Sequence, residues 1–275
     1  MDVRRALPHP ALRGIVRSFG ERRGSIGSAV LTWPLPARPH QIIDIYLAEP
    51  FRLRIDNGSL QTAPETVVVG PQGSRRIQLH MPREIHLFNI HFQPAGLNRL
   101  AGIDMTLLVN AGIAARDVLG RHATRLDDAI RLAPDFAARV AAAERWIGSM
   151  LDDGTKDPID AASRLLIASG GRARIDAIVE RSGLSARHFQ RRFSAQVGLS
   201  PKLYARTIRF DAAFSAHRRE PAKSWTRIVH EAGYFDQAHF VRECRALVGM
   251  APSELIDDWD DVFLLEMSET YKRRA

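Results

Sequence analysis

Short runs of alternating or β-branched apolar residues fill the first hundred positions and predict a β-rich N-terminal part. These runs are Ile42–Leu47, Arg52–Ile55, Val67–Val69, Arg76–His80 and Ile85–Phe92. Asp56-Asn57-Gly58 follows the second run and predicts a tight hairpin, because Asn-Gly supplies the positive φ that such a turn requires. Several short strands separated by Pro and Gly favour a sandwich or a small barrel.

From about Pro94 the apolar period changes to three or four residues, which predicts helices. Within Pro134–Leu151 the apolar residues at this spacing are Phe136, Val140, Ala143, Ile147 and Leu151. They share one face of a helix, which either packs on its own domain or forms a dimer interface.

Residues 152–157 are polar and rich in helix breakers, so they predict a linker. We therefore expect a β-rich sensing or dimerisation domain with a helical C-terminal part at 1–151, an all-α domain at 158–257 and a tail at 258–275. The expected fold class is α+β.

An internal repeat in the last third of the chain is the most informative feature. Residues 185–201 align with residues 236–252, with seven identities in 17 positions. The identical pairs are His188/His239, Phe189/Phe240, Arg191/Arg242, Ala195/Ala246, Val197/Val248, Gly198/Gly249 and Pro201/Pro252. The same unit therefore occurs twice.

Each copy has the sequence pattern of a helix-turn-helix unit. In the first copy Gly183 permits the left-handed conformation that ends a helix, and Ser185 offers an oxygen that caps the next helix. In the second copy Gly233 and Asp236 take these places. Apolar residues at steps of four predict a buried stripe in each second helix: Phe189, Phe193 and Val197, and then Phe240, Cys244 and Val248.

Between the two units, Lys202–His217 predicts a helix of about 16 residues, roughly 24 Å long. Major grooves on one face of B-DNA lie about 34 Å apart. A stiff helix of this length would hold two recognition helices at a fixed separation, so that one chain could read two adjacent grooves.

The basic residues are concentrated in the same segment. The chain has a formal net charge of +8, and residues 171–245 contain 15 Lys and Arg against seven Asp and Glu. A concentrated basic segment is the electrostatic pattern of a nucleic-acid-binding module, although a basic surface without a ligand has a similar composition.

The polar side chains outside the buried stripes suit DNA. Arg and Gln form bidentate hydrogen bonds with guanine and adenine, and each such pair discriminates between bases by about 1–3 kcal/mol. The candidate base-contacting residues are Arg187, Gln190, Arg191, Gln237 and Arg242. The candidate contacts to the DNA backbone are Arg174, Ser185, Lys202, Arg206, Arg209, Lys223 and Arg227.

These motifs resemble the AraC/XylS family of bacterial transcription regulators. Residues 183–193 are similar to the first recognition helix of that family, and residues 233–240 with 249–253 are similar to its second, more diagnostic signature. The resemblance covers about residues 158–257 and implies seven helices, with both recognition helices in the major groove. Cys244 stands where the family usually has phenylalanine, and Ala238 where a longer polar side chain often sits, so the second unit offers fewer groups for base readout.

The resemblance also implies a cupin-like sensing domain followed by a helical dimerisation segment, and residues 1–151 are compatible with this. Residues 70–72 and 91–96 resemble the front domain of one branch of the family. The implied partners are double-stranded DNA, a small-molecule effector, RNA polymerase and a second copy of the chain.

Two alternatives remain. A cupin-type enzyme or metal-dependent sensor would need metal ligands, but among His80, His86 and His91 the last two lie five residues apart on one strand and face opposite sides. We therefore expect no catalytic residue, no metal and no cofactor. A non-specific architectural DNA binder would share the salt dependence of a regulator. For about six phosphate contacts, the logarithm of the binding constant falls with the logarithm of the salt concentration with a slope of roughly −5. Such a binder would lack the sequence-specific contribution to affinity at physiological salt.

The sequence contains no apolar run of about 18 residues and no signal-peptide pattern, so we expect a cytoplasmic protein. Cys244 is the only cysteine, which excludes an intrachain disulfide and a Cys-rich zinc site. We interpret the acidic run Asp257–Asp261 as a solvated segment.

Overall fold

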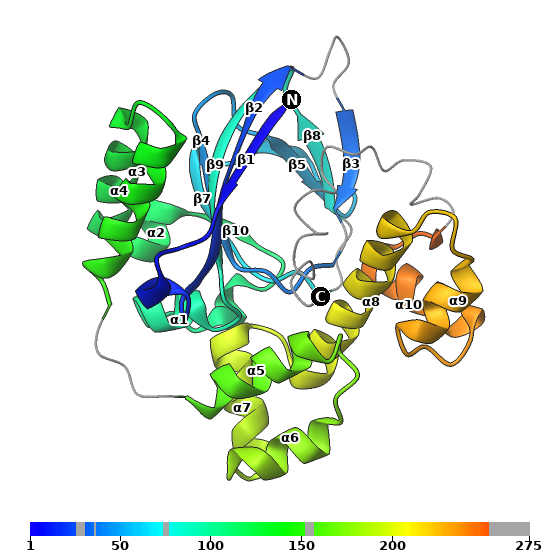
Figure 1. Ribbon diagram of the computed structural model, residues 1–275. Helices are drawn as coiled ribbons and strands as arrows, with labels where there is room; N and C mark the ends of the chain where they lie inside the picture. Colours follow the sequence, from blue (N-terminus) through cyan, green and yellow to red (C-terminus); the bar gives the residue numbers. More distant parts are fainter. Residues whose placement is uncertain (26–30, 36, 74–76, 152–156, 253–275) are drawn as a thin grey trace.

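Two antiparallel β-sheets form the N-terminal part of the computed structural model, which describes residues 1–25, 31–35, 37–73, 77–151 and 157–252 (Figure 1). The strands of the larger sheet are Asp2–Ala6 (β1), Val16–Ser25 (β2), Ile42–Tyr46 (β4), Thr66–Val69 (β7), Glu84–Phe92 (β9) and Gly112–Ala114 (β10). They lie in the order β1-β2-β9-β4-β7-β10. The strands of the smaller sheet are Leu31–Leu35 (β3), Arg52–Ile55 (β5), Leu60–Thr62 (β6) and Ile77–Met81 (β8). Their order is β3-β8-β5-β6.

The larger sheet is apolar on both faces, because successive side chains of a strand point to opposite sides. In β4, Ile43 packs with the helices that cover one face, whereas Tyr46 packs with residues of the smaller sheet. In β9, Ile90 and Leu87 repeat this division. The N-terminal part therefore has one core between sheet and helices and a second core between the two sheets, and the predicted β-rich architecture is confirmed.

The five predicted strands are present as β4, β5, β7, β8 and β9, although Arg76 lies outside the described residues. The sequence did not predict the other strands, of which β2 is the longest. Glu21 and Arg22 are buried on β2, and Glu21 accepts a hydrogen bond of 2.8 Å from Arg139 Nη1. Charged residues that are buried through pairing interrupt the apolar alternation from which strands are predicted.

The predicted hairpin is confirmed, since β5 and β6 pair across Asp56-Asn57-Gly58. The residue with positive φ is Asp56, at +53°, and not Asn57 or Gly58. Gly58 N donates a hydrogen bond of 3.0 Å to Ile55 O, which closes the turn. Asp tolerates the left-handed region because its short side chain can bond to nearby backbone groups.

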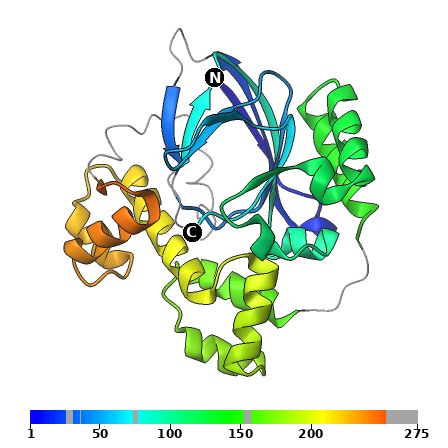
Figure 2. The same ribbon diagram turned by 180° about the vertical axis from the view of Figure 1, so that it is seen from behind.

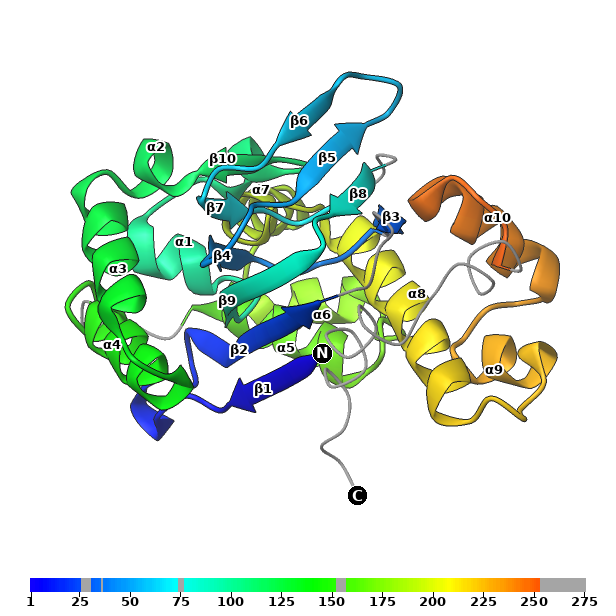
Figure 3. The ribbon, with the colours of Figure 1, turned by 90° about the horizontal axis from the view of Figure 1, so that it is seen from above.

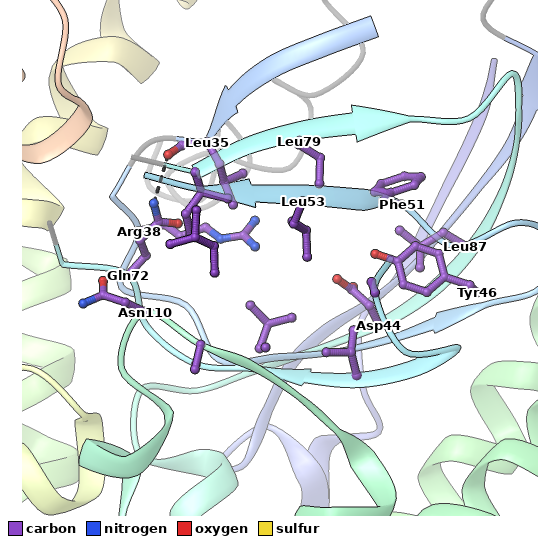
Figure 4. Close-up of a pocket in the computed structure, with 18 of the residues that line it drawn as sticks. Leu35, Arg38, Asp44, Tyr46, Phe51, Leu53, Gln72, Leu79, Leu87 and Asn110 are labelled. Atoms are coloured by element: carbon purple, nitrogen blue, oxygen red, sulfur yellow. Dashed lines mark hydrogen bonds between the residues drawn. The ribbon is translucent and has the colours of Figure 1, made fainter. Parts of the chain in front are cut away.

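Helical segments in the described N-terminal part lie mainly against the outer face of the larger sheet. They are Pro10–Leu12 (η1), Gly96–Ala101 (α1), Met105–Leu108 (η2), Ala115–Leu119 (α2), Arg121–Leu132 (α3) and Phe136–Gly148 (α4). Figures 1 and 3 show α3 and α4 side by side on the flank of the sheet that is opposite to α9 and α10. The predicted apolar stripe of α4 packs into the core of its own domain, as Ala143 and Ile147 show, so the interpretation of this stripe as a dimer interface is wrong.

The described C-terminal part is entirely helical, which confirms the α+β fold class. Its helices are Pro158–Ala168 (α5), Ile175–Ser182 (α6), Ala186–Val197 (α7), Pro201–Arg219 (α8), Trp225–Glu231 (α9) and Gln237–Val248 (α10). The implied seventh helix, the linker residues 152–156, the acidic run and the tail lie outside the described residues. The division at 152–157 stays a prediction. In the described part, no helix has both the length and the hydropathy to span a membrane.

The β-rich and helical parts touch at the end of α7. Gly198 follows this helix with a φ of +93°, and a Cβ at this position would lie 2.5 Å from Pro71 Cγ and 3.0 Å from Met105 O. Arg99 Nη1 and Asp160 Oδ2, 2.7 Å apart, form an ion pair across the same boundary. The first helix-turn-helix unit is therefore packed directly on the β-rich part.

Candidate DNA interface

The first helix-turn-helix unit consists of α6 and α7. Gly183 ends α6 with a φ of +69°, a conformation that glycine adopts without the steric cost of a Cβ. Ser185 Oγ accepts a hydrogen bond of 3.4 Å from His188 N and so caps α7. The predicted turn and cap are both confirmed.

Helix α7 separates apolar from polar side chains as predicted. The buried residues are Phe189, Phe193 and Val197. They pack with Tyr204 and Ile208 of α8. The exposed residues are Arg187, Gln190 and Arg191. This helix therefore presents two guanidinium groups and one amide to the solvent.

The second unit consists of α9 and α10. Gly233 has a φ of +86° in the turn, and Asp236 Oδ1 accepts a hydrogen bond of 2.6 Å from His239 N at the start of α10. The predicted stripe is buried: Phe240, Cys244 and Val248. Gln237 and Arg242 are exposed on the same helix. Gln237 Nε2 also donates a hydrogen bond of 2.9 Å to Thr226 Oγ1 of α9, which orients its amide at the first turn of α10.

Helix α8 connects the cores of the two units. It has 19 residues, about three more than predicted, which corresponds to roughly 28 Å. Tyr204 and Ile208 belong to the core of the first unit, whereas Phe210 and Phe214 belong to the core of the second. Figure 2 shows α7 and α10 on one side of the molecule, toward the viewer, with α8 between them. The two recognition helices are thus held by one common support.

Four of the seven candidate contacts to the DNA backbone are exposed: Arg174, Ser185, Lys202 and Arg227. Arg174 precedes α6 and Lys202 lies in the first turn of α8. Arg227 Nε also lies 3.0 Å from Glu231 Oε1, an exposed pair that water and salt weaken.

The other three candidates are engaged within the protein. Arg206 forms a bidentate pair with Glu243 of α10. Arg209 Nη2 donates to Gly171 O at 3.0 Å, and its guanidinium carbon lies 5.7 Å from the centre of the Tyr234 ring. Lys223 Nζ lies 2.6 Å from Glu231 Oε2, and this hydrogen bond raises the lysine pKa. These three side chains form interactions within the protein. We therefore propose only the four exposed residues as phosphate contacts.

One exposed residue at this surface was missed by sequence reasoning. Phe235 is 90% exposed and lies between the buried Tyr234 and the cap Asp236. The sequence signal for this exposed residue was the adjacent aromatic pair Tyr234-Phe235 in the turn. A tight turn can direct only one of two neighbouring side chains into the core, so the other must face the solvent. An exposed phenylalanine beside the first turn of α10 can contact a thymine methyl group or a sugar.

The three candidate histidines do not form a metal site within the part of the chain that the structure describes, where no group of three or more potential metal ligands occurs. His80 lies on β8, whereas His86 and His91 lie on β9. His86 Nε2 is 3.7 Å from Glu21 Oε1, and burial lowers the pKa of His86. His91 Nε2 is 3.1 Å from Asn89 Oδ1.

Residues 178–257 match the family model described as "Helix-turn-helix domain". This segment is an AraC-type DNA-binding domain. The match begins within α6 and extends beyond α10, so the AraC-type domain includes both recognition helices and the resemblance stated from the sequence is confirmed.

Among solved structures, the chain is similar to ToxT from Vibrio cholerae. A structure of ToxT at 1.65 Å is 11% identical, covers 87% of this chain and 98% of that chain, and has a TM-score of 0.49. A second structure, described as wild-type ToxT with a bound unsaturated fatty acid, is 15% identical, covers 88% of this chain and 99% of that chain, and has a TM-score of 0.42. No curated protein matches the chain.

Proposed function

We propose that this chain is a sequence-specific transcription regulator that reads two adjacent major grooves with α7 and α10. The observation that carries the proposal is the arrangement of two capped helices on one side of the molecule, each with an apolar stripe toward α8 and polar side chains toward solvent. The base-contacting residues are those predicted from the sequence: Arg187, Gln190, Arg191, Gln237 and Arg242. Arg174, Ser185, Lys202 and Arg227 contact phosphates.

We further propose that a small molecule bound in the β-rich part controls DNA binding. A cavity lies between the two sheets, and its wall is mostly apolar with a few polar groups, which is the usual composition of a ligand site. The contact between Gly198 and Pro71 places the end of α7 against this part of the protein. A change in the β-rich part therefore has a short path to the first recognition helix.

We also propose that this regulator acts in the cytoplasm and carries out no reaction of its own. Its proposed protein partners are RNA polymerase and a second copy of the chain. Co-sedimentation with RNA polymerase on operator DNA, and sedimentation of the protein alone, test these two partners separately.

Selection of binding sites from a pool of random duplexes tests the DNA-binding function. We expect enriched sites with two short motifs whose centres lie about one helical turn apart, roughly 10 base pairs. Affinity for the selected site should exceed affinity for random DNA by about a thousandfold or more at physiological salt. Equal affinity for both would instead support a non-specific architectural binder, and one motif alone would contradict the two-groove model.

A further inference from the structure

The turn of the second helix-turn-helix unit is one residue longer than the turn of the first. The first turn is Gly183-Leu184-Ser185, and the second is Gly233-Tyr234-Phe235-Asp236. In both turns the glycine has a positive φ and the last residue caps the next helix. Leu184 and Tyr234 each pack against the core of their own unit. The additional residue of the second turn is therefore Phe235.

Phe235 places an aromatic ring in the solvent beside the first turn of α10. Its exposed fraction of 90% is the highest among the large apolar residues in the described part of the chain. A single exposed apolar residue is common on protein surfaces, whereas a continuous apolar patch marks a contact with a partner. The other residues on the exposed side of α10 therefore decide what Phe235 indicates.

The exposed side of α10 combines apolar and cationic side chains. Ala238, Val241, Arg242 and Arg245 follow one another at helical spacing and share the side opposite to the buried stripe. Ala238 and the two arginines are exposed, and Val241 is partly exposed. Together with Phe235, two apolar residues of the helix thus form a small apolar surface between guanidinium groups.

The internal repeat allows a matched comparison of the two reading surfaces. Ala238 occupies the position that Arg187 has in the first unit, and Val241 occupies the position of Gln190. Both residues of the first unit are exposed. Two side chains that can form hydrogen bonds with base edges are thus replaced in the second unit by two that cannot. The second unit also gains the exposed ring of Phe235.

This exchange matches the chemistry of thymine. Thymine is the base that presents a methyl group in the major groove, and alanine and phenylalanine are among the residues that contact it. The adenine of the same or a neighbouring pair suits Gln237, whose Nε2 donates one hydrogen bond of 2.9 Å to Thr226 Oγ1. The amide oxygen and the second N–H of this side chain match the N6 and N7 groups of adenine.

The charges around the apolar surface favour DNA as its partner. Arg242 and Arg245 lie on the same side of α10. The neighbouring carboxylates are engaged within the unit, since Asp236 caps α10 and Glu231 is held in ion pairs. The surface around Phe235 is therefore positively charged, which suits a polyanion.

We propose that the two units read DNA by different chemistry. The first unit reads bases through hydrogen bonds from α7. The second unit reads thymine methyl groups, which pack against Phe235, Ala238 and Val241, so its half-site is rich in thymine–adenine pairs. The proposal rests on the proposed function, since it names the bases that the second unit recognises.

Replacement of thymine by deoxyuridine in the selected duplex tests this readout. Deoxyuridine keeps the base pair and the O4 acceptor of thymine but lacks the methyl group. We expect each replacement at a contacted thymine in the half-site of α10 to lower affinity about fourfold, because a buried methyl contact is lost. The half-site of α7 is the internal control, in which the same replacement should change affinity less than about twofold.

The two half-sites are assigned with Arg187→Ala, whose loss of base preference should fall within the half-site of α7. If deoxyuridine changes affinity in neither half-site, or equally in both, the proposed readout is wrong. If the wild type selects no DNA motif at all, the proposed function itself fails. The two failures are therefore distinguishable.

Phe235→Ala tests the role of the ring. The variant should bind the thymine duplex severalfold more weakly than the wild type and should lose the sensitivity to deoxyuridine at one position, so that the two changes are not additive. The matched control is Leu132→Ala. Leu132 is 83% exposed and ends α3, on the flank opposite to α10 (Figure 3). This control should bind both duplexes as the wild type does.

A Phe235→Ala variant with unchanged sensitivity to deoxyuridine would exclude the ring from thymine contact. Wild-type DNA affinity together with altered sedimentation of the protein would assign the ring to a contact between copies of the chain, and would also contradict the proposal. Ala238→Arg restores the side chain of the first unit at this position. It should change one preferred base of the second half-site from thymine to guanine in a repeated selection, and an unchanged motif would show that Ala238 does not face a base.

Discussion

Arg206 of α8 and Glu243 of α10 form a bidentate ion pair, with Nε 2.9 Å from Oε1 and Nη2 3.0 Å from Oε2. The carboxylate side chain is 7% exposed, whereas the arginine side chain is 35% exposed. The pair raises the pKa of Arg206, mainly through the hydrogen bond to Glu243. It fastens the second recognition helix to the helix that supports both units.

Arg206→Ala should therefore reduce stability more than DNA affinity. Removal of the guanidinium leaves a buried carboxylate without its partner, and we expect a loss of roughly 2 kcal/mol in the free energy of unfolding. This is below the loss of about 3–5 kcal/mol for a fully buried pair, because Arg206 is partly exposed. Urea unfolding measures the loss. A variant that keeps its stability but loses DNA affinity at all sequences would instead assign Arg206 to a phosphate.

Arg187 and Lys202 should have different roles in DNA binding. Arg187→Ala should lower affinity for the selected site by about 1–3 kcal/mol and leave affinity for random DNA nearly unchanged, because base contacts carry the sequence information. Lys202→Ala should weaken binding to both DNAs alike and reduce the salt slope by about one, because one fewer counterion is released. Fluorescence anisotropy over a series of salt concentrations measures both effects. Equal losses on the two DNAs for Arg187→Ala would exclude base readout by this residue.

Gly198 and Gly183 form a natural matched pair, since both end a helix with a positive φ. No atom lies within 4 Å of a Cβ built at Gly183, whereas a Cβ at Gly198 meets Pro71 and Met105 O. Gly183→Ala should cost about 1–2 kcal/mol from backbone strain alone. Gly198→Ala should cost about 1–3 kcal/mol more, because the methyl group enters a packed contact. Thermal unfolding measures the loss of stability in each variant. Equal losses would show that the contact of Gly198 with the β-rich part accommodates the methyl group at no cost in free energy.

Lower pH should destabilise the fold through His217. Its ring stacks on Trp225 at 4.4 Å between centroids, and burial lowers the pKa of His217 from its ordinary 6.5. The unfolded chain therefore binds a proton more readily than the folded chain, so this contribution to stability is complete above about pH 6.5 and is lost as the pH falls through the folded pKa. His217→Phe keeps the stacking and should flatten the decline in melting temperature between about pH 7 and about pH 5. The control His188→Phe, at an exposed position of α7, should decline like the wild type.

The two recognition units could be predicted from the sequence because their determinants are local. Gly183, Ser185 and the stripe that begins at Phe189 lie within 15 consecutive residues, and each acts through the conformation of its own helix or turn. The repeat then supplied a second, independent instance of the same pattern.

The remaining features depend on partners that are distant in the sequence. Arg206 and Lys223 looked like phosphate contacts because nothing nearby in the sequence identifies Glu243 or Glu231 as their partners. Strand β2 was missed because its buried Glu21 pairs with Arg139, 118 positions away.

The Gln41 side chain binds the last carbonyls of α7 and also accepts a hydrogen bond of 3.2 Å from Leu97 N at the start of α1. One amide thus holds together an element of the β-rich part and the end of a helix that DNA would engage. Thermodynamic linkage is reciprocal, so any influence that passes through this amide acts equally in both directions. Binding of operator DNA must then change the affinity for the small molecule by the same factor by which the small molecule changes the affinity for the operator. The operator is therefore itself an effector of the β-rich part.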